Sequence, residues 1–260
     1  MLKKILPALL MLLILLPISA RAGEIEMYKD GETTLEGYLA KPDAEKFPGA
    51  RPAILIAHQW KGLTDYEKHR ADMLADLGYI AFAVDVYGQG IRPATSEEAM
   101  KQSSIYKNDP ALARQRMNVG LTHLLGLPGV DKEKIAAFGY CFGGTMALEL
   151  ARSGADLKAV IPFHGGLATK EPAAKGVIKA PILAHHGAND PYVTKQEVAD
   201  FEKEMDEAGA DWQLVTYANA VHAFTQKEAG DDPSQGAAYN EKADHRSWAY
   251  TLDFLNQIFK

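Results

Sequence analysis

The stretch Ile135-Ala136-Ala137-Phe138-Gly139-Tyr140-Cys141-Phe142-Gly143-Gly144 decides the fold. A short apolar run, typical of a buried strand, enters a glycine-rich turn, and residues 143–152 then show the pattern of a helix. Glycines two positions before and after Cys141 indicate a nucleophile elbow, a strained strand-to-helix turn that lifts one side chain into a cleft. Such a turn also points the amide of Phe142 and the positive end of the helix toward an incoming anion.

Cys141 is the only cysteine in the 260 residues. A lone cysteine is most often a buried structural thiol, and that interpretation would be favoured in an arbitrary context. The flanking glycines favour a reactive thiol here. A single cysteine cannot form an internal disulfide, and a thiol carried into an oxidising compartment is at risk of oxidation. Reactivity therefore explains its presence better than packing does.

Strand-like and helix-like segments alternate on both sides of the elbow. A hairpin is predicted at residues 24–28 and 33–40, strands at 53–57, 79–84, 135–138, 157–163, 181–186 and 212–217, and helices at 65–77, 96–125, 143–152, 194–208 and 239–259. The alternation predicts one α/β domain over residues 23–260, with a mostly parallel central sheet and helices on both faces. In such sheets functional groups collect at the carboxyl ends of the strands.

Three candidate catalytic residues follow predicted strands, in the order nucleophile, acid, histidine. They are Cys141, Asp190 in His186-Gly187-Ala188-Asn189-Asp190, and His222 in Ala220-Val221-His222-Ala223-Phe224. This is the chain order of an α/β-hydrolase triad. His222 would take the thiol proton and later return a proton to the leaving group, while Asp190 would hold the imidazole in one tautomer.

Each member of the trio also has a plainer interpretation. Asp190 could cap a turn or the next helix, and His222 could be an ordinary loop residue. Asp85 also follows a predicted strand, but it precedes the nucleophile and is expected to shape the loop that leads to Gly88. The occurrence of all three residues in order, each after a strand, favours catalysis.

The sequence does not support a metal or a nucleotide cofactor. His185 and His186 are adjacent in a predicted strand, so their side chains point to opposite faces and cannot bind one ion. His58 and His164 lie near strand ends, but no metal-binding spacing accompanies them. The glycine-rich turns lack the rest of a dinucleotide or phosphate-loop pattern. We therefore predict no metal and no cofactor.

Residues 1–22 have the pattern of a secretory signal peptide. Lys3 and Lys4 form a charged start, residues 5–18 an apolar stretch, and Ala20-Arg21-Ala22 a small-x-small cleavage site. The apolar stretch is short for a bilayer span of about 20 residues, which disfavours an uncleaved anchor. We expect cleavage after Ala22 and a secreted, periplasmic mature protein.

The formal net charge is −6. Residues 1–22 carry basic residues, so their removal would leave a mature chain that is more acidic still. A chain of this charge is a poor candidate for binding nucleic acid or, once the signal is removed, an anionic membrane surface. The expected partner is a small molecule. The sequence leaves the oligomeric state open.

Four motifs together resemble the dienelactone hydrolase family of α/β-hydrolases, and the likeness spans essentially the whole mature chain. The most specific is the elbow with cysteine in place of the commoner serine. The motifs are Gly139-Tyr140-Cys141-Phe142-Gly143-Gly144, Asp85-Val86-Tyr87-Gly88, His186-Gly187-Ala188-Asn189-Asp190 and His222-Ala223-Phe224. The resemblance implies the α/β-hydrolase fold and hydrolysis of an ester or lactone substrate through a thioester, without a cofactor.

By the same resemblance, Cys141, Asp190 and His222 match the family's triad. The backbone amides of Trp60 and Phe142 would form the oxyanion hole, where each donor contributes on the order of 3 kcal/mol. Loop side chains near the strand ends are candidates for shaping the substrate pocket. These candidates are Gln59, Tyr87, Arg92, His164 and Phe224.

The chain departs from the family pattern at positions that bear on substrate and activation. Gln59 stands where many relatives have Glu, and Gln cannot accept a proton, so His222 is expected to activate Cys141 alone. Gln89 and Gln226 stand where enzymes acting on dienelactone have arginines for the substrate carboxylate, which disfavours dienelactone itself. Two other functions stay open: a binding protein on a hydrolase scaffold that has lost turnover, and a thioesterase or acyltransferase.

Overall fold

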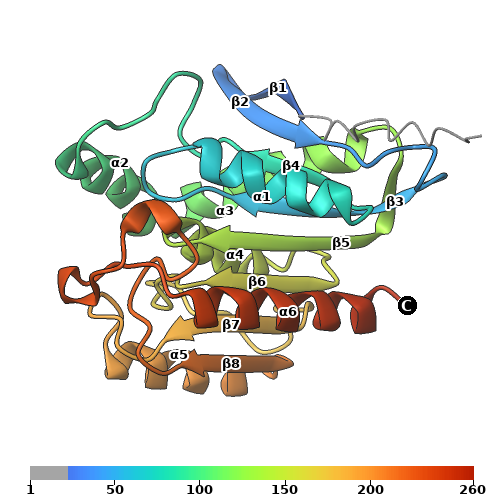
Figure 1. The fold of residues 1–260 in the computed structure, drawn as a ribbon. Coiled ribbons are helices and arrows are strands. Elements are labelled where there is room, and N and C mark those ends of the chain that lie inside the picture. The colour runs from blue at the N-terminus through green and yellow to red at the C-terminus, as the bar shows by residue number, and fades with distance from the viewer. Residues whose placement is uncertain (1–22) are drawn as a thin grey trace, which may run out of the picture.

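Eight strands form one sheet in the computed structural model, which describes residues 23–260 (Figure 1). Their order across the sheet is β1-β2-β4-β3-β5-β6-β7-β8. The pairs β1–β2 and β2–β4 are antiparallel and all the others are parallel. The strands are β1 (Glu24–Asp30), β2 (Thr33–Ala40), β3 (Arg51–Ala57), β4 (Ile80–Val84), β5 (Val130–Tyr140), β6 (Ala159–Phe163), β7 (Ile182–Gly187) and β8 (Trp212–Tyr217).

Helices cover both faces of this sheet, as the alternating pattern predicts. One face packs against α1 (Asp65–Asp76) and α6 (Glu241–Ile258), which lie in front of the sheet in Figure 1. The other face packs against α3 (Pro110–Gly126), α4 (Phe142–Arg152) and α5 (Lys195–Ala208). Strand β3 shows why both faces are buried. Its residues Ile54 and Ile56 point into one core and Leu55 into the other, because side chains alternate along a strand.

The stretch with helix signals over residues 96–125 is helical, and the structure divides it into two helices. Helix α2 (Ser96–Asn108) ends before Asp109, and α3 begins at Pro110. Asp109 is extended, with φ −129° and ψ 87°, as expected for a residue that precedes proline. Its side chain accepts a hydrogen bond from the amide of Leu112 and so caps α3. The Asp-Pro pair therefore ends one helix and starts the next.

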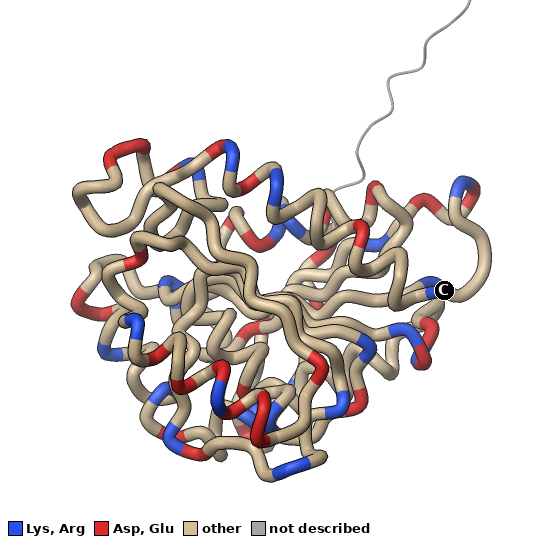
Figure 2. Tube along the Cα trace, turned by 90° about the horizontal axis from the view of Figure 1, so that it is seen from below, with Lys and Arg blue, Asp and Glu red and all other residues tan. Residues whose placement is uncertain are grey.

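Charged side chains of both signs are interspersed along the outer helices and loops, while the central strands carry few (Figure 2). Within residues 23–260 no helix combines the length and the apolar character needed to cross a bilayer. The expected signal peptide, residues 1–22, lies outside the described residues.

Candidate active site

The turn between β5 and α4 presents Cys141 in a backbone conformation that side chains rarely adopt, with φ 55° and ψ −120°. A residue in such a region costs on the order of 1–3 kcal/mol and persists only where the surroundings enforce it. Glycines make this enforcement possible. A Cβ on Gly139 would overlap the carbonyl of Gly143, and a Cβ on Gly143 would overlap that of Ala57. A Cβ on Gly144 would lie 2.8 Å from the Cα of Gly165.

Cys141 is partly exposed as a residue, and its sulfur faces several groups that stabilise a negative charge. Burial opposes ionisation of the thiol, but the charge of His222 and a hydrogen bond from its ring lower the pKa of Cys141 below its ordinary value. The backbone amides of Phe142 and Trp60 also hydrogen-bond to the sulfur and lower its pKa further. The sulfur thus lies against an imidazole on one side and two amides on the other.

His222 lies between the nucleophile and a carboxylate. Its Nδ1 is 2.8 Å from Oδ2 of Asp190, whose side chain is fully buried. Burial alone would lower the pKa of His222, but the Cys141 thiolate and the hydrogen bond to Asp190 raise it to about 10. Both shifts favour the ionised forms, a thiolate on Cys141 and an imidazolium on His222. The structure brings together the three side chains that the sequence singled out.

The loop after β3 carries the second amide that reaches the sulfur. The Tyr87 hydroxyl donates to the carbonyl of Trp60 at 2.9 Å, and the amide of Gln59 donates to the buried carboxylate of Glu67 at 3.0 Å. The side chains of Tyr87 and Glu67 thus fix the loop on both sides of the Trp60 amide. The Nε2 atom of Gln59 is buried and has no hydrogen-bond partner within residues 23–260.

The five expected pocket residues differ in their burial and in their hydrogen-bond partners. Gln59 and Tyr87 are nearly buried in or against the loop that carries Trp60. Arg92 donates to the carbonyls of Leu63, Gly88 and Ile91, so its guanidinium is engaged by the protein. His164 and Phe224 are fully buried, with ring centroids 5.1 Å apart. These last two lie behind the site instead of lining an open pocket, because neither has surface that a substrate could touch.

Asp85 shapes a loop, as its position before the nucleophile suggested. Its Oδ1 accepts from the amides of Tyr87 and Gly88, and its Oδ2 accepts from the amide of Glu36. With its side chain fully buried and occupied by backbone donors, Asp85 is not free to orient a histidine. It fixes the loop from which Tyr87 reaches Trp60.

Sequence reasoning missed an exposed aromatic residue beside the histidine. Tyr192 has 59% of its surface exposed, and its ring lies edge-on to His222 with centroids 5.3 Å apart. Its amide donates to Oδ1 of Asp190 at 2.8 Å. In the sequence, the one indication that Tyr192 lies near the site is its position two residues after Asp190, the candidate acid.

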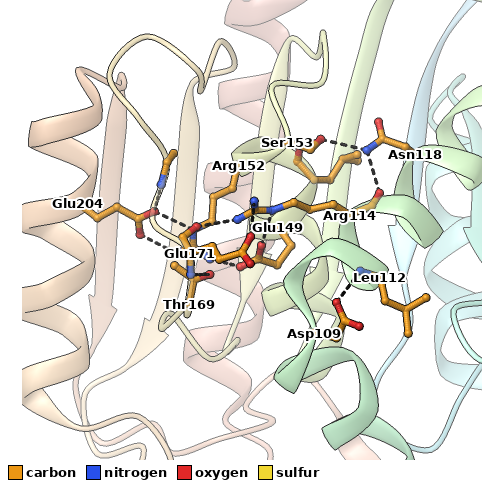
Figure 3. A network of polar contacts seen from close by, with 12 residues as sticks. Asp109, Leu112, Arg114, Asn118, Glu149, Arg152, Ser153, Thr169, Glu171 and Glu204 are labelled. Atoms are coloured by element: carbon orange, nitrogen blue, oxygen red, sulfur yellow. Dashed lines mark hydrogen bonds and ion pairs between the residues drawn. The ribbon is translucent and has the colours of Figure 1, made fainter.

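A buried ion network at the far end of α4 was also missed (Figure 3). Arg152 is bound by Glu149 at 3.0 Å and by Glu204 of α5 at 2.7 Å, and its guanidinium also donates to the carbonyl of Leu167. Arg114 of α3 binds the same Glu149 at 2.9 Å. The network joins α3, α4 and α5, so the helix that begins directly after Cys141 is fixed at its last turn.

Within residues 23–260 no group of three or more His, Cys, Asp or Glu side chains is arranged to hold a metal ion. The two adjacent histidines of β7 differ, because Nδ1 of His186 has no hydrogen-bond partner within residues 23–260 whereas both ring nitrogens of His185 are engaged. His185 lies 3.0 Å from Oγ1 of Thr251 and 2.9 Å from the hydroxyl of Tyr217.

Residues 35–259 match the model of the dienelactone hydrolase family. The chain is 36% identical to the solved structure named m3DLH, with a TM-score of 0.87 over 92% of this chain and 98% of that one. It is also 36% identical to a dienelactone hydrolase-like promiscuous phosphotriesterase from metagenomic libraries, with a TM-score of 0.84 over 91% of this chain and 98% of that one. A Bradyrhizobium protein named "Probable 2-oxo-3-(5-oxofuran-2-ylidene)propanoate lactonase" is 26% identical over 89% of this chain and 92% of its own length. These likenesses agree with the α/β-hydrolase fold.

Proposed function

The chain belongs to the dienelactone hydrolase family of carboxylic-ester hydrolases, and from this premise we propose that it cleaves esters or lactones through a thioester on Cys141. The catalytic groups are Cys141 as nucleophile, His222 as acid and base, and Asp190 as the carboxylate that orients His222. The backbone amides of Trp60 and Phe142 form the oxyanion hole.

In the first half of the reaction the Cys141 thiolate attacks the ester carbonyl carbon, and a C–S bond forms. The carbonyl oxygen becomes an oxyanion, which accepts hydrogen bonds from the amides of Trp60 and Phe142. As the tetrahedral intermediate collapses, the C–O bond to the leaving group breaks and the His222 imidazolium gives its proton to the departing oxygen. The products of this half are an alcohol, a thioester and a neutral His222.

In the second half His222 takes a proton from a water molecule, and the resulting hydroxide attacks the thioester carbonyl. The same two amides stabilise the second oxyanion. Collapse breaks the C–S bond and releases the carboxylic acid, which restores the thiolate and the imidazolium. Asp190 stabilises that imidazolium through the bond of 2.8 Å to Nδ1 and does not itself carry the proton.

One observation carries the proposal: Cys141 is partly exposed, and His222 and the amides of Trp60 and Phe142 are placed so that they stabilise its thiolate. A structural thiol needs none of these partners. An acyl-transfer nucleophile needs all of them, because activation and oxyanion stabilisation must meet at one atom.

The test uses p-nitrophenyl esters of increasing acyl length and a set of small lactones, with the chain from Gly23 onward. The expected result is turnover that is lost in Cys141→Ala, together with a mass increase of one acyl group on the protein after rapid acid quenching. Turnover that survives in Cys141→Ala would remove Cys141 from the mechanism. No turnover on any substrate, with Cys141 inert toward iodoacetamide, would instead support a binding protein on a hydrolase scaffold.

Thioester hydrolysis and acyl transfer pass through the same acyl-enzyme, so the same samples distinguish them. Addition of a small alcohol or amine diverts the acyl group to that acceptor in an acyltransferase, and acyl-thiol substrates outcompete esters in a thioesterase. We expect hydrolysis to dominate, in keeping with the lactonase name of the Bradyrhizobium relative.

A phosphate triester is the second candidate substrate. The likeness to a promiscuous phosphotriesterase, at 36% identity, supports this choice. The thiolate would attack phosphorus and the two amides would bind the phosphoryl oxygen. Paraoxon, a phosphate triester, is therefore added to the esters and lactones tested, with Cys141→Ala as the control.

We also propose that residues 1–22 are a cleaved signal peptide and that residues 23–260 form one periplasmic domain. The charged start, the apolar stretch and the small-x-small site support this location. Expression of the full chain in a Gram-negative host, followed by N-terminal sequencing of the periplasmic fraction, tests it. A protein that keeps Met1 and stays with the cytoplasmic fraction contradicts it.

A further inference from the structure

A row of buried hydrogen bonds leads away from the backbone of the nucleophile. The amide of Cys141 donates to two acceptors, the carbonyl of Phe163 at 3.0 Å and Nδ1 of His164 at 3.1 Å. A backbone N–H can only donate, so Nδ1 is the accepting nitrogen and the ring proton lies on Nε2. That Nε2 is 2.8 Å from Oγ1 of Thr225. The structure therefore fixes which tautomer of His164 is present.

The row continues through α1 to α6. Oγ1 of Thr225, which accepts from His164, also lies 2.6 Å from the phenol oxygen of Tyr66, and either hydroxyl can donate in that bond. The phenol oxygen accepts from Nε of Arg70 at 3.1 Å. Arg70 in turn donates to Asp244 at 2.7 Å and to the carbonyl of Thr225 at 3.0 Å.

His164 is held in a conformation that it would not adopt by itself. Its φ of 40° lies in the left-handed region, and its side chain is fully buried. Such a conformation costs on the order of 1–3 kcal/mol and needs a surrounding structure that enforces it. The bonds to Cys141 and to Thr225, at the two nitrogens of the ring, provide that structure.

Several titratable groups surround the ring. His222 lies 5.4 Å away between ring centroids and Tyr140 of β5 lies 6.1 Å away. Burial, the charge of His222 and the charges of Arg70 on α1 and His185 on β7 lower the pKa of His164 well below its ordinary value. His164 thus stays neutral beside a charged His222, although the two rings are neighbours.

We propose that His164 is a positioning residue: locked as the Nε2–H tautomer by Thr225, Tyr66 and Arg70, it holds the Cys141 amide in the turned conformation of the elbow. The inference rests on the proposed role of Cys141 as nucleophile. The position of that amide decides where the sulfur and the Phe142 amide point. Because the Nδ1 lone pair is occupied, His164 also offers no second base, and the proton of Cys141 passes to His222 alone.

The test removes the hydroxyl of Thr225, which accepts the Nε2 proton and also binds Tyr66. Thr225→Val has nearly the same shape but leaves that proton without a partner, whereas Thr225→Ser keeps the hydroxyl. We expect Thr225→Val to lower kcat about tenfold or more with KM nearly unchanged, because a buried donor without a partner displaces the ring that holds the nucleophile. The pH midpoint for alkylation of Cys141 by iodoacetamide should rise, and Thr225→Ser should restore both values.

Thr251→Val is a matched control. Thr251 is also fully buried and its hydroxyl also binds a buried histidine, His185, at 3.0 Å, but that pair does not contact Cys141. It should leave kcat and the alkylation midpoint unchanged even if stability falls. Equal losses in Thr225→Val and Thr251→Val, or no rescue by Thr225→Ser, would overturn the inference. If Thr225→Val does not fold, Tyr66→Phe removes the next hydroxyl in the row and is judged by the same two readouts.

A direct measurement needs no substitution. Nitrogen-15 spectra of the labelled histidines should show His164 as the Nε2–H tautomer from pH 5 to pH 9, with no titration in that range. A protonated His164, or the Nδ1–H tautomer, overturns the inference. The proposed function fails separately, through activity that persists in Cys141→Ala.

Discussion

Oδ2 of Asp190 lies 2.8 Å from Nδ1 of His222, and the two residues come from the loops that follow the neighbouring strands β7 and β8. The bond fixes the tautomer of His222 and stabilises its charged form. Asp190→Asn should lower kcat by roughly 10²–10⁴-fold with little change in KM. Steady-state kinetics on one ester measure this, and Asp253→Asn, at an exposed carboxylate on α6, is the control. A kcat within threefold of the parent protein would show that Asp190 does not orient His222.

The pH profile follows from the two opposed pKa shifts in the site. At acid pH the sulfur is protonated, and activity should rise below the ordinary thiol range because the pKa of Cys141 is lowered. At alkaline pH His222, whose pKa is raised to about 10, loses the proton that it gives to the leaving group. The kcat/KM for an alkyl ester, which needs that proton, should therefore reach a plateau above the lowered pKa of Cys141 and fall near pH 10.

Alkylation by iodoacetamide separates the two limbs, because it needs the thiolate but no proton donor. It should share the acid limb of kcat/KM and lack the alkaline one. His222→Ala should move the acid limb up toward the ordinary thiol pKa of about 8.5. An alkylation midpoint near 8.5 in the parent protein would contradict the thiolate–imidazolium pair.

Gly143→Ala tests whether the elbow depends on a close approach of backbones. A Cβ there would overlap the carbonyl of Ala57, and backbone atoms of β3 cannot move without disturbing the sheet. We expect a loss of at least about 3 kcal/mol in the free energy of unfolding, or failure to fold. Gly126→Ala, at an exposed position of α3 with open space around it, should be neutral or stabilising by up to about 1 kcal/mol. Urea unfolding followed by circular dichroism compares the two.

Arg152→Ala tests the buried ion network at the end of α4. Removal of this side chain would leave Glu149 and Glu204 buried without their shared cation. The expected cost is about 3–5 kcal/mol in the free energy of unfolding. Lys203→Ala breaks the exposed pair of Lys203 with Glu207 on α5 and should cost less than about 1 kcal/mol. Similar costs for the two variants would mean that the buried network adds nothing.

Most of the strands and helices could be predicted because their signals are local. The apolar run 53–57 and the alternation of strands with helices predict a buried parallel sheet, and the glycines around Cys141 predict the elbow. The break between α2 and α3 was missed although Asp109 and Pro110 carry the signal for it. Helical patterns lie directly on both sides of that pair, so the two segments together resemble one long helix.

The clustering of Cys141, Asp190 and His222 could be predicted from the sequence. The residues that hydrogen-bond to His164, directly or in a row, could not. Cys141, Asp190 and His222 follow strands in a fixed order, which is visible in one dimension. Thr225, Tyr66 and Arg70 reach His164 from segments far apart in the chain, and only the packing of α1 against the loop after β8 brings them together. His164 and Phe224 were expected at a pocket surface because strand ends usually lie there, and their full burial reflects the cover that α1, α6 and the following loop provide.

The contact of α4 with β3 and with the loop after β6, made backbone to backbone through Gly143 and Gly144, divides the molecule into parts that evolution can change at different rates. Any larger residue at these glycines would overlap backbone atoms, so we expect every substitution there to be harmful. The exposed side chain of Tyr192, which lies beside His222 in the loop after β7, is under no such limit. Residues of this kind can therefore change in descendants of this chain while the turn at residue 141 is inherited unchanged.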